Sequence, residues 1–185
     1  MNLIRSLLWF PAVSAAFLLV GGCSQEKPLP TVHSVDLHRY LGKWFEIAHA
    51  ANRFQRADEQ AVAEYSPLSA TSVRVHNTAH DRNGKTRTIE GTAEVVPGSN
   101  GARLRVKFGG FAALAPVSKD GNYWIIDLDP QYRSAMVGTP DRQYLWILAR
   151  SPALDPATLK FYLIPSFINN VTYVREAGKR ERWLE

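Results

Sequence analysis

The chain has 185 residues and a formal net charge of +5, from 22 lysine and arginine residues against 17 aspartate and glutamate residues. This length suits a single domain with short extensions. The basic residues are spread along the chain, and the lack of a dense basic stripe argues against a nucleic-acid-binding protein. A single cysteine excludes an internal disulfide.

The first 22 residues have the pattern of a signal peptide. Arg5 precedes an apolar run over residues 7–20, which is shorter than the roughly 20 apolar residues of a membrane span. The run ends in Val20-Gly21-Gly22-Cys23, which resembles a bacterial lipobox. The resemblance implies that residues 1–22 are removed and that Cys23 is acylated, and two or more acyl chains anchor a protein firmly in a membrane. An ordinary signal peptide followed by an incidental cysteine is the alternative.

The segment after the cysteine reads as a tether. Residues 24–30 are polar and contain two prolines, so we interpret residues 23–34 as a link between the lipid anchor and a folded domain at residues 35–185. Ser24, rather than an aspartate, follows the cysteine. By the sorting rule that the lipobox resemblance implies, this favours the outer membrane of a Gram-negative bacterium, with the protein lipid-anchored on the periplasmic face.

Short segments of alternating apolar and polar residues follow a helical turn expected at residues 35–41. We predict eight strands, at residues 44–50, 60–66, 72–77, 87–95, 103–108, 123–129, 134–137 and 144–150. Asn83-Gly84 and the segment 97–101 favour tight turns, and Pro67 is expected to end the second strand. The pattern predicts an all-β fold, an eight-stranded antiparallel up-and-down barrel, which is just wide enough for one small ligand.

Three motifs are placed along these strands. Gly42-Lys43-Trp44 opens the first strand, Asp129-Pro130-Gln131-Tyr132 follows the sixth, and Arg150 ends the eighth. In this order and spacing, over roughly residues 36–152, they resemble the motifs of the lipocalin family. The resemblance implies a barrel that holds a hydrophobic ligand, with a C-terminal α-helix packed on its wall.

The resemblance also implies how the narrow end of the barrel is closed. Arg150 is expected to lie across the ring of Trp44, a cation–π contact worth about 0.5–2 kcal/mol. We expect five residues to close this end: Gly42, Trp44, Asp129, Tyr132 and Arg150.

The ligand is expected in the wider half of the barrel. Alternate residues of a strand share a face, so Glu46 and Ala48 are expected to face inward with Trp44. By the family's register, the ligand-binding residues are Glu46, Ala63, Tyr65, Val75, Phe108, Tyr123, Ile125 and Trp146. An inward carboxylate must be paired or neutralised. The partner of Glu46 stays open between a tyrosine or arginine of the barrel and a cationic or hydroxylated ligand headgroup.

Two further elements are expected outside the eight strands. A helix is predicted after Pro152, capped by Asp155 or Ser151 and stopped by Pro165, and a short strand is predicted at residues 171–174. The apolar loop at residues 108–117 is interpreted as a lid over the barrel mouth. The alternative is that Phe111 and Leu114 contact a membrane or a second copy of the chain.

These observations predict an outer-membrane lipoprotein that holds or transports fatty acids or lysophospholipids, in envelope maintenance or stress. Its partners are lipids and, through acylated Cys23, the membrane; homodimer formation stays open, and no cofactor, metal or nucleic acid is expected. A structural lipoprotein with a filled barrel is one alternative. An enzyme is another, but no cysteine follows Cys23, and neither a G-x-S-x-G nor an H-E-x-x-H motif is present. The histidines are interpreted as surface residues: His33, His38, His49, His76 and His80.

Overall fold

The computed structural model describes residues 29–50, 55, 59–110, 117–163 and 171–173. The predicted signal peptide, Cys23, the apolar segment 111–116, Pro165 and the tail after residue 173 lie outside the described residues. None of the helices in the described ranges is long and apolar enough to cross a membrane.

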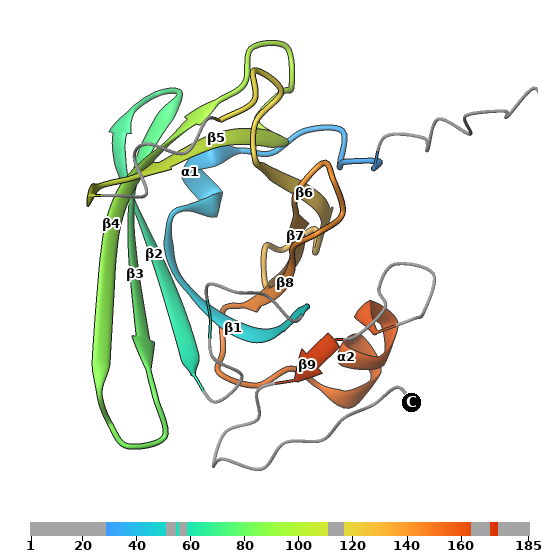
Figure 1. The fold of residues 1–185 in the computed structure, drawn as a ribbon. Coiled ribbons are helices and arrows are strands. Elements are labelled where there is room, and N and C mark those ends of the chain that lie inside the picture. The colour runs from blue at the N-terminus through green and yellow to red at the C-terminus, as the bar shows by residue number, and fades with distance from the viewer. Residues whose placement is uncertain (1–28, 51–54, 56–58, 111–116, 164–170, 174–185) are drawn as a thin grey trace, which may run out of the picture.

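The described chain forms the predicted barrel (Figure 1). The elements are α1 (Leu37–Tyr40), β1 (Gly42–Ala50), β2 (Gln60–Ser69), β3 (Ser72–His80), β4 (Thr86–Val95), β5 (Arg103–Phe108), β6 (Tyr123–Leu128), β7 (Ser134–Gly138), β8 (Leu145–Ala149), α2 (Pro156–Tyr162) and β9 (Val171–Tyr173). Strands β1 to β8 pair as antiparallel neighbours, and β1 pairs with both β2 and β8, which closes the sheet. The predicted helical turn, the C-terminal helix with its Asp155 cap and the short ninth strand are confirmed.

The prediction that Pro67 ends the second strand is wrong. Strand β2 continues to Ser69, paired with β3, and Pro67 lies opposite Val73. The pairing of β2 with β1 reaches only Tyr65. Since β2 is an edge strand beyond Tyr65, the missing N–H of proline removes no ladder bond to β1.

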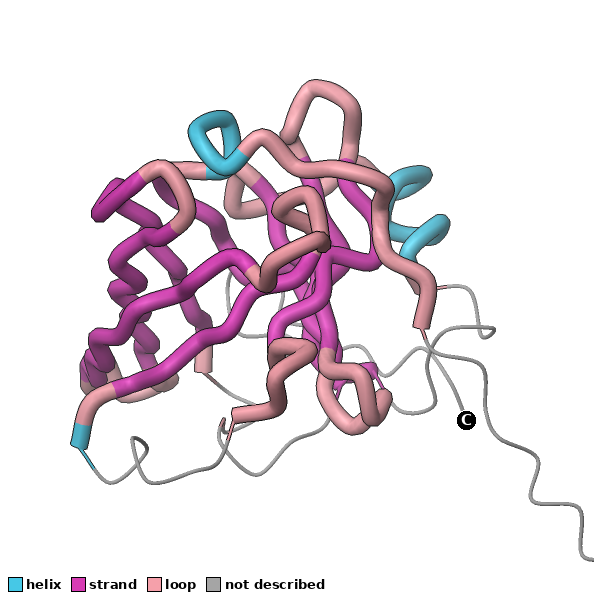
Figure 2. Tube along the Cα trace, turned by 90° about the horizontal axis from the view of Figure 1, so that it is seen from above, coloured by secondary structure: helices cyan, strands magenta, loops and turns pink. Residues whose placement is uncertain are grey.

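Two hydrophobic clusters lie on opposite sides of the barrel wall. The inner cluster has at its centre Trp44, Tyr65, Val75, Leu104, Ile125, Val137 and Leu148. The outer cluster packs α2 and the N-terminal segment against the wall, through Leu29, Ile47, Ala48, Trp124, Ile126, Met136, Ile147 and Tyr162. In Figure 1, α2 lies outside the ring of strands, and Figure 2 shows the cyan helices at the periphery of the magenta strands.

A bulge in β1 overturns two predictions. In the pairing with β8, Glu46 lies opposite Leu148 and Ala48 lies opposite Ile147, so Ile47 is the extra residue. A bulge reverses the in–out alternation. Ala48, predicted to face inward, therefore belongs to the outer cluster. His49, predicted at the surface, is 1% exposed and contacts the inward-facing Glu46.

Along one of its edges, β1 pairs first with β2 and then, after the bulge, with β9. Residues 42–45 pair with β2, whereas Ala48, His49 and Ala50 pair with β9. Strands β1 and β2 thus separate toward the end of the barrel at which β1 finishes, and β9 takes up the edge of β1 that β2 leaves. We call this wider end the mouth, and the end at Gly42 the closed end.

The N-terminal segment is fixed to the closed half of the barrel by backbone hydrogen bonds. The N–H of Val32 donates to the carbonyl of Ile125 at 3.0 Å, and the N–H of Val35 donates to that of Asn100 at 2.8 Å. Gly101 follows directly, with φ +81°, and a Cβ there would lie 2.4 Å from the carbonyl oxygen of Val35. Only glycine fits this contact, because both the backbone conformation and the space exclude a side chain.

We expect Gly101→Ala to lower the free energy of unfolding by at least about 3 kcal/mol, because the methyl group forces the N-terminal segment away from its turn. Gly84→Ala is the matched control: Gly84 also has positive φ, +77°, but nothing lies within 4 Å of its Cβ position. It should cost only the conformational strain, about 1–2 kcal/mol. Urea unfolding of both variants measures the difference, and equal losses would contradict the packing argument.

Candidate functional site

Arg150 joins separate segments at the closed end of the barrel. Its guanidinium carbon lies 3.9 Å from the centre of the Trp44 ring. Its N–H groups donate to three backbone carbonyls: Tyr132 at 3.2 Å, Lys43 at 2.9 Å and Arg39 at 2.8 Å. One planar side chain therefore ties the end of β8 to α1, to the start of β1 and to the loop between β6 and β7.

The loop between β6 and β7 is ordered by Asp129. Its carboxylate accepts from the backbone N–H groups of Gln131 and Arg133 and from the guanidinium of Arg133, at 2.8 and 2.9 Å. These bonds, above all those from the Arg133 side chain, lower the pKa of Asp129 to about 2. The hydroxyl of Tyr132 accepts from the N–H of Asp36 at 2.8 Å.

The five residues predicted for closure therefore meet at one end of the barrel. Gly42 belongs with them, since a Cβ there would lie 3.5 Å from a guanidinium nitrogen of Arg150. This end is buried: Trp44 is 0% exposed, and its ring N–H donates to the carbonyl of Tyr40 at 2.8 Å.

Above the closed end, three tyrosines form what we call the tyrosine floor: Tyr40, Tyr65 and Tyr123. The hydroxyl oxygens of Tyr40 and Tyr123 lie 2.8 Å apart, and Tyr65 donates to Tyr123 at 3.1 Å. Burial raises the pKa of Tyr65 to about 12 and those of Tyr40 and Tyr123 well above their usual range. All three phenols are therefore uncharged at neutral pH.

The predicted ligand-binding residues lie on the inner side of the wall, at two levels. Tyr65, Val75 and Ile125 are buried in the inner cluster. Ala63, Phe108, Tyr123 and Trp146 are only partly buried and pack against it, and Glu46 shares their side of the wall. The inner surface thus passes from fully packed near the floor to partly exposed toward the mouth.

Two further inward-facing residues, which the predicted ligand-binding set did not include, lie at the level nearer the mouth. Asn77 and Ile89 face each other across β3 and β4, in the same in–out alternation as the buried Val75 and Ala93. Ile89 is nevertheless 40% exposed. An inward-facing side chain keeps such exposure only where the interior is accessible to solvent. Both residues lie within the predicted third and fourth strands, so applying the in–out alternation from Val75 to Asn77, and from Ala93 to Ile89, would have found them.

A polar network links the neighbouring strands β1 and β8 through Gln55. The Glu46 carboxylate lies 2.6 Å from Nδ1 of His49 and accepts from the amide of Gln55 at 2.8 Å, and Gln55 accepts from the Trp146 ring N–H at 2.8 Å. Glu46 is thus paired inside the protein, and its partners among the described residues are His49 and Gln55 rather than a tyrosine or an arginine. The sequence signal failed because the bulge turns His49 inward and a loop supplies Gln55.

An ion pair lies at the mouth, between the residue that precedes β2 and the start of β4. Glu59, 2% exposed, accepts two hydrogen bonds from the guanidinium of Arg87, at 3.1 and 2.5 Å. Arg87 lies opposite Ala79, two residues beyond Asn77 on the same face. A bidentate pair of this kind fixes both side chains at the rim.

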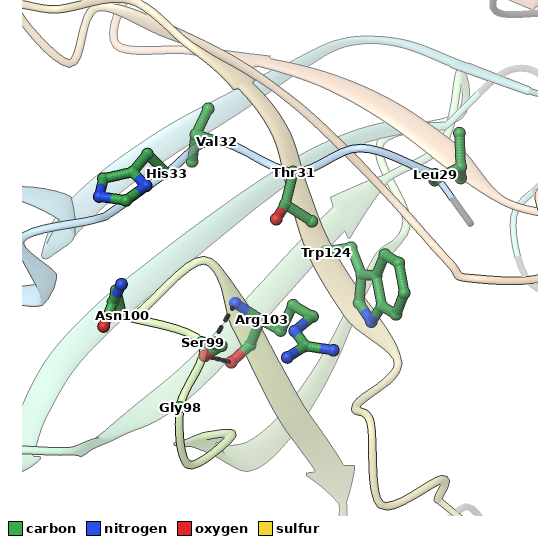
Figure 3. A pocket seen from close by; sticks show the side chains of 9 residues that line it. All are labelled: Leu29, Thr31, Val32, His33, Gly98, Ser99, Asn100, Arg103 and Trp124. Carbon is green, nitrogen blue, oxygen red and sulfur yellow. Dashed lines mark hydrogen bonds between the residues drawn. The ribbon is translucent and has the colours of Figure 1, made fainter. Parts of the chain in front are cut away.

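A separate groove lies on the outer wall (Figure 3). It is bounded by the N-terminal segment, the turn between β4 and β5, and two side chains, Arg103 and Trp124, with the guanidinium 5.4 Å from the ring centre. Trp124 belongs to the outer cluster, so this groove does not open into the barrel interior. Across the described ranges, no group of three histidine, cysteine or acidic residues is arranged to hold a metal ion.

Comparison with known proteins identifies the family. A family model described as a lipocalin-like domain matches residues 35–164. The chain belongs to the lipocalin family. Among this lipocalin's relatives, the outer membrane lipoprotein Blc of Escherichia coli K12 is 38% identical over 156 residues, 82% of this chain and 84% of that protein. Temperature-induced lipocalin-1 of Arabidopsis thaliana is 36% identical over 141 residues, 74% of each chain.

Solved structures share the fold at low sequence identity. Insecticyanin from the tobacco hornworm Manduca sexta has a TM-score of 0.57 at 18% identity, with 81% of this chain and 86% of that chain covered. Lobster apocrustacyanin A1 has a TM-score of 0.56 at 14% identity, with 83% and 93% covered. At these identities the likeness concerns the barrel alone.

We expect Arg150→Lys to lower the free energy of unfolding by about 3 kcal/mol, because an ammonium group cannot stack on Trp44 and reach three carbonyls at once. Arg133→Lys is the control, since Arg133 is 71% exposed and solvent screens its pairing with Asp129, so this exchange should change stability little. Thermal unfolding followed by near-ultraviolet circular dichroism reports both stability and the environment of Trp44. Similar losses in the two variants would contradict the closure role.

Proposed function

We propose that this lipocalin binds one acyl-chain lipid, a fatty acid or a lysophospholipid, within its barrel. The observation that carries the proposal is the two-level interior: a sealed closed end and, toward the mouth, apolar side chains that are partly exposed although they face inward. Ile89, Phe108 and Trp146 are these side chains. A barrel filled by its own side chains would bury them.

Hydrophobic transfer alone supplies enough energy for such a ligand. Burying each methylene contributes about 0.8 kcal/mol, so a long acyl chain offers about 10 kcal/mol before the costs of association. Those costs are at least about 4 kcal/mol. Micromolar affinity therefore needs no specific polar contact, and an apolar wall with few polar groups is sufficient.

The polar groups near the mouth suit the headgroup of an amphiphile. Glu46 with His49 lies next to β8, and Glu59 with Arg87 lies toward β4 at the rim. An acyl chain that points toward the floor leaves its headgroup at this end of the barrel, where the exposed Arg87 and Ile89 show access to solvent, which reduces the cost of charge. This arrangement favours the carrier over a structural lipoprotein, which needs no accessible interior.

We also propose that the protein is anchored to the periplasmic face of the outer membrane through acylated Cys23. The relatives named outer membrane lipoprotein support this, together with the lipobox-like sequence before the cysteine. Leu29, the first described residue, follows Cys23 by six positions, which span at most about 20 Å when extended. The barrel would then remain next to the bilayer, from which a lipid could enter. A role in envelope maintenance or stress follows from this position.

The binding proposal is tested by adding bulk to the inner wall. Ala63 faces inward and is partly exposed, so we expect Ala63→Phe to weaken palmitate binding at least about tenfold by occupying space for several methylenes. Val62→Phe, one residue away on the opposite face, should bind as the wild type does. All described elements lie after residue 28, so residues 24–185 contain the barrel and serve as the protein for titration followed by tryptophan emission. Failure of the folded wild-type protein to bind any acyl chain would instead support a filled barrel.

The anchor is tested by Cys23→Ser. We expect the wild-type protein in a Gram-negative host to sediment with outer membranes and to carry the mass of its acyl groups. The variant should lack that mass and appear in the soluble periplasmic fraction, because one hydroxyl cannot take part in thioether acylation. Ser24→Ala serves as the control and should remain with the membrane. A Cys23→Ser protein that still sediments with outer membranes would argue against acylation as the anchor.

A further inference from the structure

The tyrosine floor has more hydrogen-bond donors than it uses. Its three hydroxyl groups carry one proton each, but two hydrogen bonds join them: Tyr65 to Tyr123, and Tyr40 with Tyr123. In the described part of the chain these hydroxyls have no further partner. Because Tyr65 donates to Tyr123, the unused proton belongs to Tyr40 or Tyr123.

Of the two residues that can carry the unused proton, Tyr123 lies where a ligand can reach it. Tyr40 is 1% exposed and Tyr65 5%, whereas Tyr123 keeps partly exposed surface. Tyr123 faces inward at the level where the wall begins to open. A buried hydroxyl proton without an acceptor costs free energy, which a ligand oxygen in contact with it would recover.

The surroundings of the floor select an uncharged oxygen. The nearest cation below it, Arg150, lies on the Trp44 ring and donates to three backbone carbonyls. Among the described side chains, a carboxylate at the floor would meet one phenolic donor and no free positive charge, and its desolvation would exceed that gain. A hydroxyl group has a much smaller desolvation cost and both accepts and donates.

The wall above the floor carries a complementary acceptor. The side-chain oxygen Oδ1 of Asn77 is buried and has no hydrogen-bond partner among the described residues. Asn77 lies two residues from Val75, which is opposite Tyr65, on the same face of the sheet. The interior thus presents an unused neutral donor at its base and an unused neutral acceptor one inward-facing position higher.

We propose that the tyrosine floor is a subsite for an uncharged hydroxyl group on an apolar chain, which enters the barrel with this group first. The ligand class is a long-chain alcohol or an acyl chain hydroxylated far from its headgroup. The proposal rests on the proposed function in that the barrel must hold an apolar chain. It adds polar selectivity at the buried end, which an acyl chain ending in a methyl group would not use.

The test compares 1-nonanol with n-decane, which have the same number of non-hydrogen atoms, in displacing a fluorescent fatty acid from residues 24–185. The variant replaces Tyr40, Tyr65 and Tyr123 together by Phe, since removing the whole network leaves no orphaned hydroxyl. We expect nonanol to bind this variant about five- to tenfold more weakly, and decane to bind it as tightly as the wild type or more tightly. Tyr162→Phe is the control, because Tyr162 is buried but bonds to Ser134 on the outer wall.

A second measurement needs no variant. In the wild-type protein, nuclear Overhauser effects should connect the hydroxymethyl protons of nonanol with the ring protons of Tyr40 and Tyr123, and not its terminal methyl group. Contacts of the methyl end with the floor, or equal weakening of both ligands in the triple variant, would overturn the subsite. Palmitate binding without hydroxyl selectivity would refute this inference alone, whereas no binding of any chain would refute the proposed function with it.

Discussion

The stack of Arg150 on Trp44 is the contact on which the rest of the barrel depends. Strand pairing closes the sheet around its axis but leaves backbone carbonyls at the strand ends without partners. Arg150 satisfies three of these at once, from segments on either side of the end. Because its guanidinium also covers the indole ring, Trp44 is shielded from water, and the partly exposed inward side chains of the described strands lie toward the mouth.

Sealing one end allows the same strands to serve two purposes. Near the floor, Val75 and Ala93 are buried and contribute to stability. Further toward the mouth, at Asn77, two positions after Val75, and at Ile89, four positions before Ala93, the inward side chains no longer fill the interior, and Ile89 remains exposed. Gly91 lies between these levels, where a Cβ would come 2.3 Å from the carbonyl of Lys107. Glycine at this position thus allows the two strands to approach closely and leaves space toward the mouth. The space for a ligand therefore does not reduce the packing near the floor.

Sequence patterns predicted the strands and the closed end well, since both follow from local rules: a period of two along each strand and motifs at fixed places. They failed where the pairing breaks the period. The extra residue Ile47 moves Ala48 outward and His49 inward, and nothing in the local sequence distinguishes this from regular alternation. The partners of Glu46 were missed for the same reason, and because Gln55 comes from a loop whose path the strand pattern does not determine.

The polar groups of the interior differ in charge between the mouth and the floor, and this difference favours one orientation of a bound ligand. Ionisable pairs, Glu46 with His49 and Glu59 with Arg87, lie toward the mouth, where each buried carboxylate has a hydrogen-bonding partner that lowers the free-energy cost of its charge. At the floor, the described polar side chains are neutral phenols. A charged headgroup is therefore least unfavourable at the mouth, while a neutral oxygen gains most at the base. An amphiphile with one group of each kind would bind in a single orientation, fixed by desolvation rather than by shape.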